Sequence, residues 1–155
     1  MSLLEVLIAL FVFSVGMLGI AALSLASFQA TSNSLWSARA TLLVDDMADR
    51  IRANPVGRNS YATADAASGT NQGCQQTGGG IPVACTPLQM ADDDLFRWNQ
   101  ALNDPTTGLP DANGAALPDV VGSITVDPAT RPETVTITVT WNDRSGSASH
   151  SISLQ

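Results

Sequence analysis

The sequence predicts an α+β protein in which a long N-terminal helix packs on a small antiparallel sheet. Three observations support this fold class. Glu5 is the only charged residue before Arg39, within a long apolar run. An amphipathic helical pattern follows that run without a break. The last third of the chain alternates apolar and hydroxyl side chains with a period of two, which is typical of strands with one buried face. Helical and strand patterns that occupy separate parts of a chain indicate an α+β fold.

Composition limits the classes of function. A chain of 155 residues suits one modest domain plus an anchor. The net charge is −7, and all seven basic residues are arginines. A nucleic-acid binder needs clustered cations to neutralise phosphates, and no such cluster or polybasic membrane patch is present in the sequence. We therefore expect no nucleic-acid partner, and contacts made mainly through apolar surface and shape.

Residues 1–26 have the composition of a membrane-spanning helix. The stretch VLIALFVFSVGMLGIAALSLA, residues 6–26, is interrupted only by Ser and Gly. About 20 apolar residues suffice to cross a bilayer as a helix. A cleavable signal peptide is the competing interpretation, but no basic segment precedes the run and no A-x-A site closes a short one. Either a leader has been removed before Met1, or little of the chain lies on the cytoplasmic side.

Gly16 and Gly19 lie about one turn apart in the middle of this run. Small residues allow close approach of helices in lipid, which favours a packing face. Each glycine also lowers helix propensity by about 1 kcal/mol relative to alanine, which would make a weak point. Both interpretations can hold, and we favour packing.

Residues 27–54 continue the helix as an amphipathic segment. Its apolar stripe, at i, i+4, i+7 spacing, consists of Trp36, Ala40, Leu43, Met47 and Ile51, widened by Val44 and Ala48. Asp46 and Arg50 are spaced as a favourable helix pair. Asn54-Pro55 should end the helix, because the residue before proline avoids the helical region. The stripe predicts one face packed against a globular head, residues 55–155.

The head begins with a segment, residues 56–85, that has few apolar residues and no period, so we expect a loop. Cys74 and Cys85 could form a disulfide there if the head is exported, and would otherwise be free thiols. Zinc is disfavoured because no second Cys/His pair exists. The TGGG run lacks the Lys-Ser/Thr that a phosphate-binding loop needs.

A short helix is expected at about residues 87–103. Thr86 and Gln89 form a capping box around Pro87. An apolar stripe consists of Leu88, Ala91, Leu95, Trp98 and Leu102. The run Asp92–Asp94 raises the question of calcium binding or catalysis. We interpret it instead as a solvated face, because negative charge in the first turns complements the helix dipole.

After a loop at residues 104–119, strands are expected at about residues 120–127, 133–141 and 147–154. In the clearest one Val135, Ile137, Val139 and Trp141 share a face, with threonines opposite. The third strand places His150, Ile152 and Leu154 inward. His150 is the only histidine, and no motif gives it a nucleophile or metal partner. We expect no enzyme activity, no cofactor and no metal site.

Four stretches carry a resemblance to a known family. SLLEVLIALFVFSVGMLG resembles the N-terminal signal of type IV pilins and type II secretion pseudopilins. ATLLVDDMADRIRANP, CTPLQMADDDLFRWNQAL and VTITVTWNDRSG resemble the minor pilins of the PilV kind. The resemblance spans most of the chain outside the loops. Pseudopilins of the GspI kind share the N-terminus but tend to have shorter heads, so the pilus interpretation is preferred.

The resemblance implies a type IV pilin-like fold and an assembly role. A prepilin peptidase would cut before Met1, which stands where the family usually has Phe, and would methylate the new amine. Glu5 would then set the registry between subunits by pairing with a neighbouring subunit's N-terminal amine. Before assembly the helix would lie in the inner membrane, at the assembly platform, with the head in the periplasm.

The resemblance implies as partners other minor pilins, the major pilin and a large tip adhesin. The complex would prime pilus growth, form the tip, and support twitching motility and adhesion. Two alternatives are a minor pseudopilin of a type II secretion system and a generic membrane-anchored periplasmic binding protein.

Overall fold

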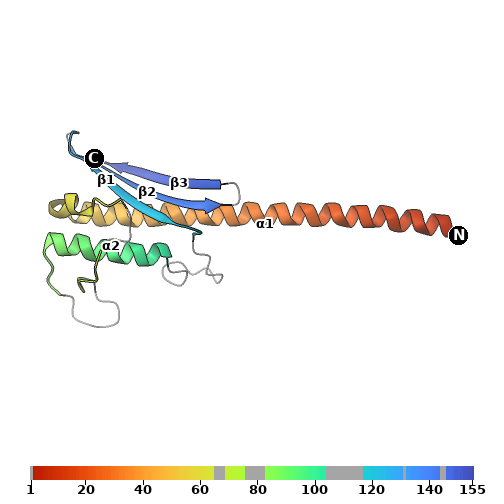
Figure 1. Ribbon diagram of the computed structural model, residues 1–155, viewed down its shortest axis with the longest axis horizontal. Coiled ribbons are helices and arrows are strands. Elements are labelled where there is room, and N and C mark those ends of the chain that lie inside the picture. The colour runs from red at the N-terminus through yellow and green to blue at the C-terminus, as the bar shows by residue number, and fades with distance from the viewer. Residues whose placement is uncertain (1, 65–68, 76–82, 104–116, 131, 144–145) are drawn as a thin grey trace. The chain divides into compact units, whose positions relative to one another are not determined.

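The computed structural model describes residues 2–64, 69–75, 83–103, 117–130, 132–143 and 146–155. The chain divides into two compact units, Met1–Leu35 and Trp36–Gln155. We describe each unit by itself. Helix α1, Leu3–Ala53, runs through both (Figure 1).

The first unit consists of the apolar part of α1. Ser2 begins the helix, since its carbonyl oxygen accepts from the amide of Glu5 at 3.0 Å. Hydroxyls within the helix donate to carbonyl oxygens three or four residues earlier, as in Ser14 to Phe11 and Ser24 to Ile20. These bonds satisfy polar groups that would otherwise be costly in an apolar environment.

The second unit is built around the end of α1, which runs between α2 (Pro87–Asn103) and the strands (Figure 1). The predicted stripe is buried at Ala40, Val44, Met47, Ala48 and Ile51, while Trp36 and Leu43 pack against its margin. The helix ends where the Asn54-Pro55 pair predicts. A short 3-10 helix, η1 (Pro55–Tyr61), follows, so the loop expected from residue 56 is wrong over its first turns.

Helix α2 begins with the predicted capping box. The Gln89 side chain accepts from the Thr86 amide at 3.0 Å, and the Thr86 hydroxyl accepts from the Gln89 amide at 3.3 Å. Trp98 is fully buried and its indole N–H donates to the Leu43 carbonyl at 2.9 Å, which joins α2 to α1. Leu88, expected on the buried stripe, is instead 65% exposed.

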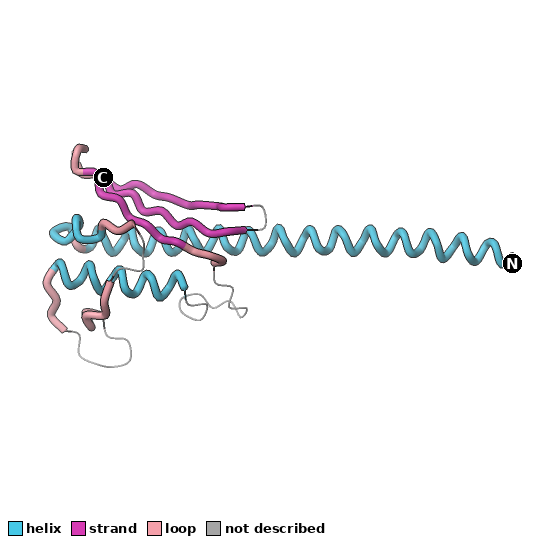
Figure 2. The backbone as a smooth tube through the Cα atoms, in the orientation of Figure 1, coloured by secondary structure: helices cyan, strands magenta, loops and turns pink. Residues whose placement is uncertain are grey.

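The sheet is antiparallel with the order β1-β2-β3, and Figure 2 shows the strands side by side. Its strands are β1 (Val121–Asp127), β2 (Thr134–Asp143) and β3 (Gly146–Leu154). The pairing is continuous, for example Ile124↔Ile137 and Ile137↔Ile152. Burial alternates along β2, where the predicted apolar residues face the core.

Gly122 in β1 allows the sheet to approach α2, because a Cβ there would lie 2.6 Å from the Trp98 ring. The core thus joins α1, α2 and one face of the sheet, as the predicted α+β fold requires. The arrangement matches the type IV pilin-like fold that the sequence predicts. The loop expected at 104–119 lies mostly outside the described residues.

Candidate functional site

The apolar part of α1 is the largest uncovered apolar surface in the described residues. Its side chains are exposed from Leu3, at 85%, through Phe28, at 72%. α1 is one helix that is long and apolar enough to cross a membrane, with a mean hydropathy of 2.7 over its best 18-residue window, none of it buried. Such a surface needs a cover of lipid or of other helices.

The residues predicted to act in this segment lie on that surface. Glu5 is exposed in the first turn of α1, where a carboxylate complements the helix dipole. Its side chain has no hydrogen bond or ion pair with any described residue. Gly16 and Gly19 have no atom within 4 Å of the position that a Cβ would take. Met1 lies outside the described residues.

The acidic run Asp92–Asp94, expected to be a solvated face, is mostly buried. Asp93 is 0% exposed and Asp94 is 2% exposed. The expectation of solvation is therefore wrong for these two residues. Buried carboxylates require charged or hydrogen-bonding partners, and both have several.

Asp94 joins three parts of the head. Its carboxylate accepts from Arg50 of α1 at 2.9 Å, from the Tyr61 hydroxyl at 2.7 Å and from the Gln75 amide at 2.9 Å. Arg50 also pairs with Asp46 at 2.9 Å, as the sequence predicts. Burial and the hydrogen bond to Asp94 raise the pKa of Tyr61. The cluster ties α1 and η1 to α2.

Asp93 holds the segment Gly69–Gln75 against α2. One oxygen accepts from the backbone amides of Gln72 at 2.8 Å and Gly73 at 3.1 Å, and the other accepts from Arg97 at 2.8 Å. Burial alone would raise the pKa of Asp93, but these hydrogen bonds outweigh it and the pKa is lowered. The neighbouring Asp92 also has a lowered pKa, because Thr70 and Gln72 donate hydrogen bonds to it.

A disulfide closes the same region. Cys74 and Cys85 are joined, with their Cα atoms 5.7 Å apart. Cys74 is buried. The cross-link and the Asp93 hydrogen bonds together fix Gly69–Gln75 on α2. Gly69 takes a φ of +123° there, and a Cβ would lie 2.5 Å from the amide nitrogen of Phe96.

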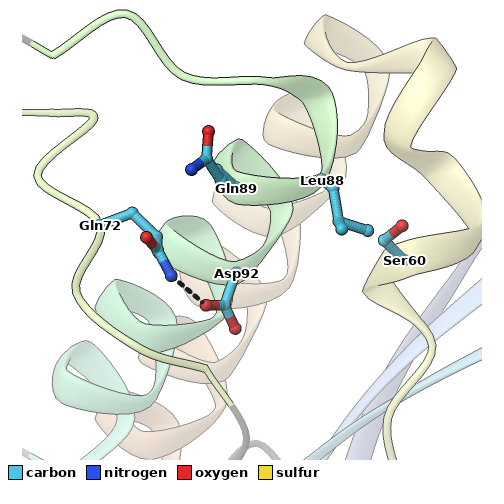
Figure 3. Close-up of a pocket in the computed structure, with 5 residues that line it drawn as sticks. All are labelled: Ser60, Gln72, Leu88, Gln89 and Asp92. Atoms are coloured by element: carbon cyan, nitrogen blue, oxygen red, sulfur yellow. Dashed lines mark hydrogen bonds between the residues drawn. The ribbon is translucent and has the colours of Figure 1, made fainter.

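A small open pocket lies between α2, η1 and this segment (Figure 3). Its lining consists of Ser60, Gln72, Leu88, Gln89 and Asp92. In Figure 3 Gln72 donates to the Asp92 carboxylate, a bond of 2.7 Å, and Leu88 points toward Ser60. Asp92 is the one titratable side chain of this lining, and its carboxylate accepts hydrogen bonds from Thr70 and Gln72. This arrangement offers no acid–base pair or activated nucleophile.

No group of three or more His, Cys, Asp or Glu side chains in the described part of the chain could hold a metal ion. His150 is half-buried on β3 and is paired with Val139 of β2.

The buried cluster was detectable from spacing. Asp94 follows Ala91 by three residues and precedes Trp98 by four, so it shares their helical face. Asp93 and Arg97 also have the i, i+4 spacing of a helix ion pair. Tyr61 carried no such signal, since its partner Asp94 lies far away in sequence. Arg39 of α1 also contacts α2, since its guanidinium donates to the Ala101 carbonyl oxygen at 3.1 Å.

A comparison with known families agrees with this fold. The family model described as "Tt1218-like: Type IV pilin Tt1218" matches residues 22–96, from the apolar part of α1 into α2. The match supports the type IV pilin superfamily and favours a structural, non-enzymatic role in assembly with other pilins. The apolar N-terminal helix fits a membrane-anchored pilin. Comparisons with curated proteins and with solved structures found no significant match.

Proposed function

We propose that the chain is a minor pilin, of the PilV kind, that joins other minor pilins to prime type IV pilus assembly and forms part of the pilus tip. The carrying observation is the contrast within α1: the end of the helix is covered by the head, while its apolar beginning is exposed. Residues 1–26 would lie in the inner membrane before assembly and among other pilin helices afterwards, with the head in the periplasm and then outside the cell.

Glu5 gives the apolar segment a means of selecting its neighbour. A carboxylate near the centre of a membrane span costs about 2.5–3.5 kcal/mol on insertion scales, and less nearer the end. Arg39, the first basic residue, is far out of reach at about 1.5 Å per residue along the helix. The N-terminal amine of a neighbouring subunit would pair with Glu5 and fix the axial position of the two helices. Met1, as the processed and methylated residue, would supply that amine.

Gly16 and Gly19 would form part of the contact face. The space beside them is free of this chain's own atoms, so a neighbouring helix backbone can approach closely there. This role depends on the same packing between neighbouring helices whose axial position Glu5 would fix.

The test compares Glu5→Ala with the head variant Glu133→Ala, which removes a carboxylate outside the apolar segment. Each is expressed in cells that lack the native chain, and the chain is measured in membranes and in sheared pili. We expect Glu5→Ala to reach the membrane but to be lost from pili, while Glu133→Ala is incorporated normally. Normal incorporation of Glu5→Ala would refute the pairing.

Cross-linking from the head separates the alternatives. Captured pilus subunits or a tip adhesin would support the proposal, whereas captured secretion-system components would favour a pseudopilin. Replacing residues 3–26 by an unrelated membrane span gives a second distinction. Retained function after that exchange would favour an anchored binding protein, because only assembly depends on the sequence of this helix.

A further inference from the structure

Asp92 differs from the two other aspartates of the run in α2, because no described residue supplies it with a cation. Arg97 pairs with Asp93 at 2.8 Å, and Arg50 pairs with Asp94 at 2.9 Å. The carboxylate of Asp92 forms no ion pair within the described part of the chain, and the donors that reach it are neutral. Its charge is therefore available to a cation from another molecule.

The arginines that the structure describes are all bound elsewhere. Besides Arg50 and Arg97, Arg39 and Arg58 donate to backbone carbonyl oxygens, and Arg52 pairs with an aspartate of its own helix. The chain has no lysine, and its net charge is −7. A cation that binds at the unpaired carboxylate of α2 would therefore come from a partner, and it would complement the charge of the chain.

The pocket beside Asp92 offers hydrogen-bond acceptors and an apolar wall (Figure 3). Both side-chain hydrogen bonds to Asp92 end on Oδ2, which leaves Oδ1 for a further donor. Gln72 donates through Nε2, and its Oε1 is left to accept. Ser60 adds a hydroxyl, and the exposed side chain of Leu88 forms the apolar wall.

An arginine or lysine side chain has the two properties that this pocket requires. Its methylene stem packs on apolar surface while its charged end remains at polar groups. A guanidinium or ammonium donates charge-assisted hydrogen bonds to a carboxylate, whereas an apolar occupant would leave Asp92 desolvated without a partner. The volume of about 250 Å³ lies below the usual range of small-molecule sites, about 300–1,000 Å³, and suits a single side chain.

We propose that this pocket receives an arginine or lysine side chain of a partner protein, with the charged end at Asp92 and Gln72 and the stem against Leu88. A charge pair at the rim of an interface selects the partner more than it strengthens the binding. The contact would thus determine which protein docks on this part of the head. The inference does not depend on the pilus role, because the partner is defined by its basic side chain.

The first test titrates the full chain, in uncharged detergent micelles, with N-acetyl-arginine methylamide and follows its NMR signals. We expect saturable shifts at Gln72, Leu88 and Asp92. N-acetyl-citrulline methylamide has nearly the same shape without the charge, and it should bind at least about fivefold more weakly. This comparison uses the native chain and needs no variant.

Two variants locate the charge that the arginine probe recognises. Asp92→Asn keeps an oxygen that accepts from Thr70 and Gln72 but removes the charge, so the preference for arginine over citrulline should be lost. Asp45→Asn removes a charge from the exposed face of α1 and should keep the preference. The backbone amide of Gln72, which donates to Asp93, reports whether the segment remains in place.

Cross-linking at Leu88 identifies the side chain that the pocket receives. A photo-reactive phenylalanine derivative replaces Leu88 in cells that lack the native chain, and the cross-linked peptide of the partner is mapped. We expect an arginine or lysine there whose replacement by aspartate lowers the cross-linking, and Asp92→Lys should then restore it. A secretion-system partner with such a side chain would support the pocket and refute the pilus role.

Any of three results would overturn the proposal. The arginine probe could fail to saturate the signals of the pocket, or could bind no better than the citrulline probe. The preference for arginine could survive in Asp92→Asn, which would place the binding elsewhere on the chain. The cross-linked peptide could lack a basic residue, or its basic residue could be replaced without loss of cross-linking.

Discussion

The carboxylates of the first unit and of the second unit differ in their hydrogen-bond partners. Glu5 lies among exposed apolar side chains and has no partner among the described residues. Asp93 and Asp94 are buried in the head, and both have charged and neutral hydrogen-bond donors from the same chain. A carboxylate outside water needs compensation in both cases. The head supplies it internally, whereas our proposal assigns the partner of Glu5 to a neighbouring subunit.

The apolar side chains show the same difference. The stripe from Ala40 to Ile51 is covered by α2 and the sheet, whereas the residues from Leu3 to Phe28 are exposed in the part of the chain that the structure describes. We therefore expect the head to be stabilised by its own contacts, and the apolar helix to be covered by a membrane or by other subunits. Substitutions in the two units should accordingly change different observables.

The largest expected effect is that of Asp94→Ala on the free energy of unfolding of the head. The substitution leaves the buried Tyr61 hydroxyl without its carboxylate acceptor and removes one of the two carboxylates that pair with Arg50, which keeps Asp46. Removing one member of a fully buried ion pair costs about 3–5 kcal/mol, and we expect a loss near the lower end of that range because Arg50 stays paired. Urea unfolding followed by tryptophan fluorescence measures this loss.

Glu5→Ala is the matched control for this comparison, since it removes a carboxylate from the other unit. We expect it to leave the urea transition of the head unchanged. An equal loss of stability in both variants would contradict the division into a self-contained head and a helix completed by partners.

The second effect concerns the disulfide. Replacing both Cys74 and Cys85 by serine opens a loop with a sequence separation of 11. Loop-closure entropy gives a cost of about 2–3 kcal/mol. A reducing agent should lower the stability of the native chain by the same amount and leave the double variant unaffected. The helical content of the first unit, measured by circular dichroism, should not change.

The third effect uses glycines from the two units. Gly122→Ala places a Cβ within 2.8 Å of both Trp98 and Leu102, and overpacking of this kind costs about 1–3 kcal/mol. Gly16→Ala meets no atom of the chain and should leave the head unchanged. If Gly16 packs against neighbouring helices, the same alanine should reduce incorporation into pili. A stable Gly122→Ala head would show that Trp98 can move aside.

The sequence predicted the elements better than the connections between them. Local signals identified the end of α1 at Asn54, the cap of α2 at Thr86 and the alternation along β2. The acidic run was misinterpreted: Asp94 shares the helical face of Ala91 and Trp98, but a charged residue is expected to be exposed. The partners Arg50 and Gln72 are brought beside these carboxylates only by the tertiary fold. The 3-10 helix at Pro55 was missed for a similar reason. It depends on Asn54, whose side chain accepts from Gly57 and donates to the Pro87 carbonyl.

The smallest expected effect is the contribution of Asp93 to the loss of stability in acid. Its pKa in the folded chain lies below the ordinary value of 3.8. The stabilisation is therefore fully present above about pH 4 and is lost as the pH falls through the folded pKa. The slope for one such proton is at most about 1.4 kcal/mol per pH unit.

Asp93→Asn removes this proton and should flatten the dependence of the urea midpoint on pH below pH 4. Asp45→Asn, on the exposed face of α1, controls for net charge. Protonation of Asp93 removes the negative charge that strengthens the hydrogen bonds from the Gln72 and Gly73 amides, so these two amides should exchange faster in the same pH range. An unchanged slope in Asp93→Asn would mean that the acid response arises elsewhere in the head, and that the carboxylate stabilises Gly69–Gln75 no better than an amide does.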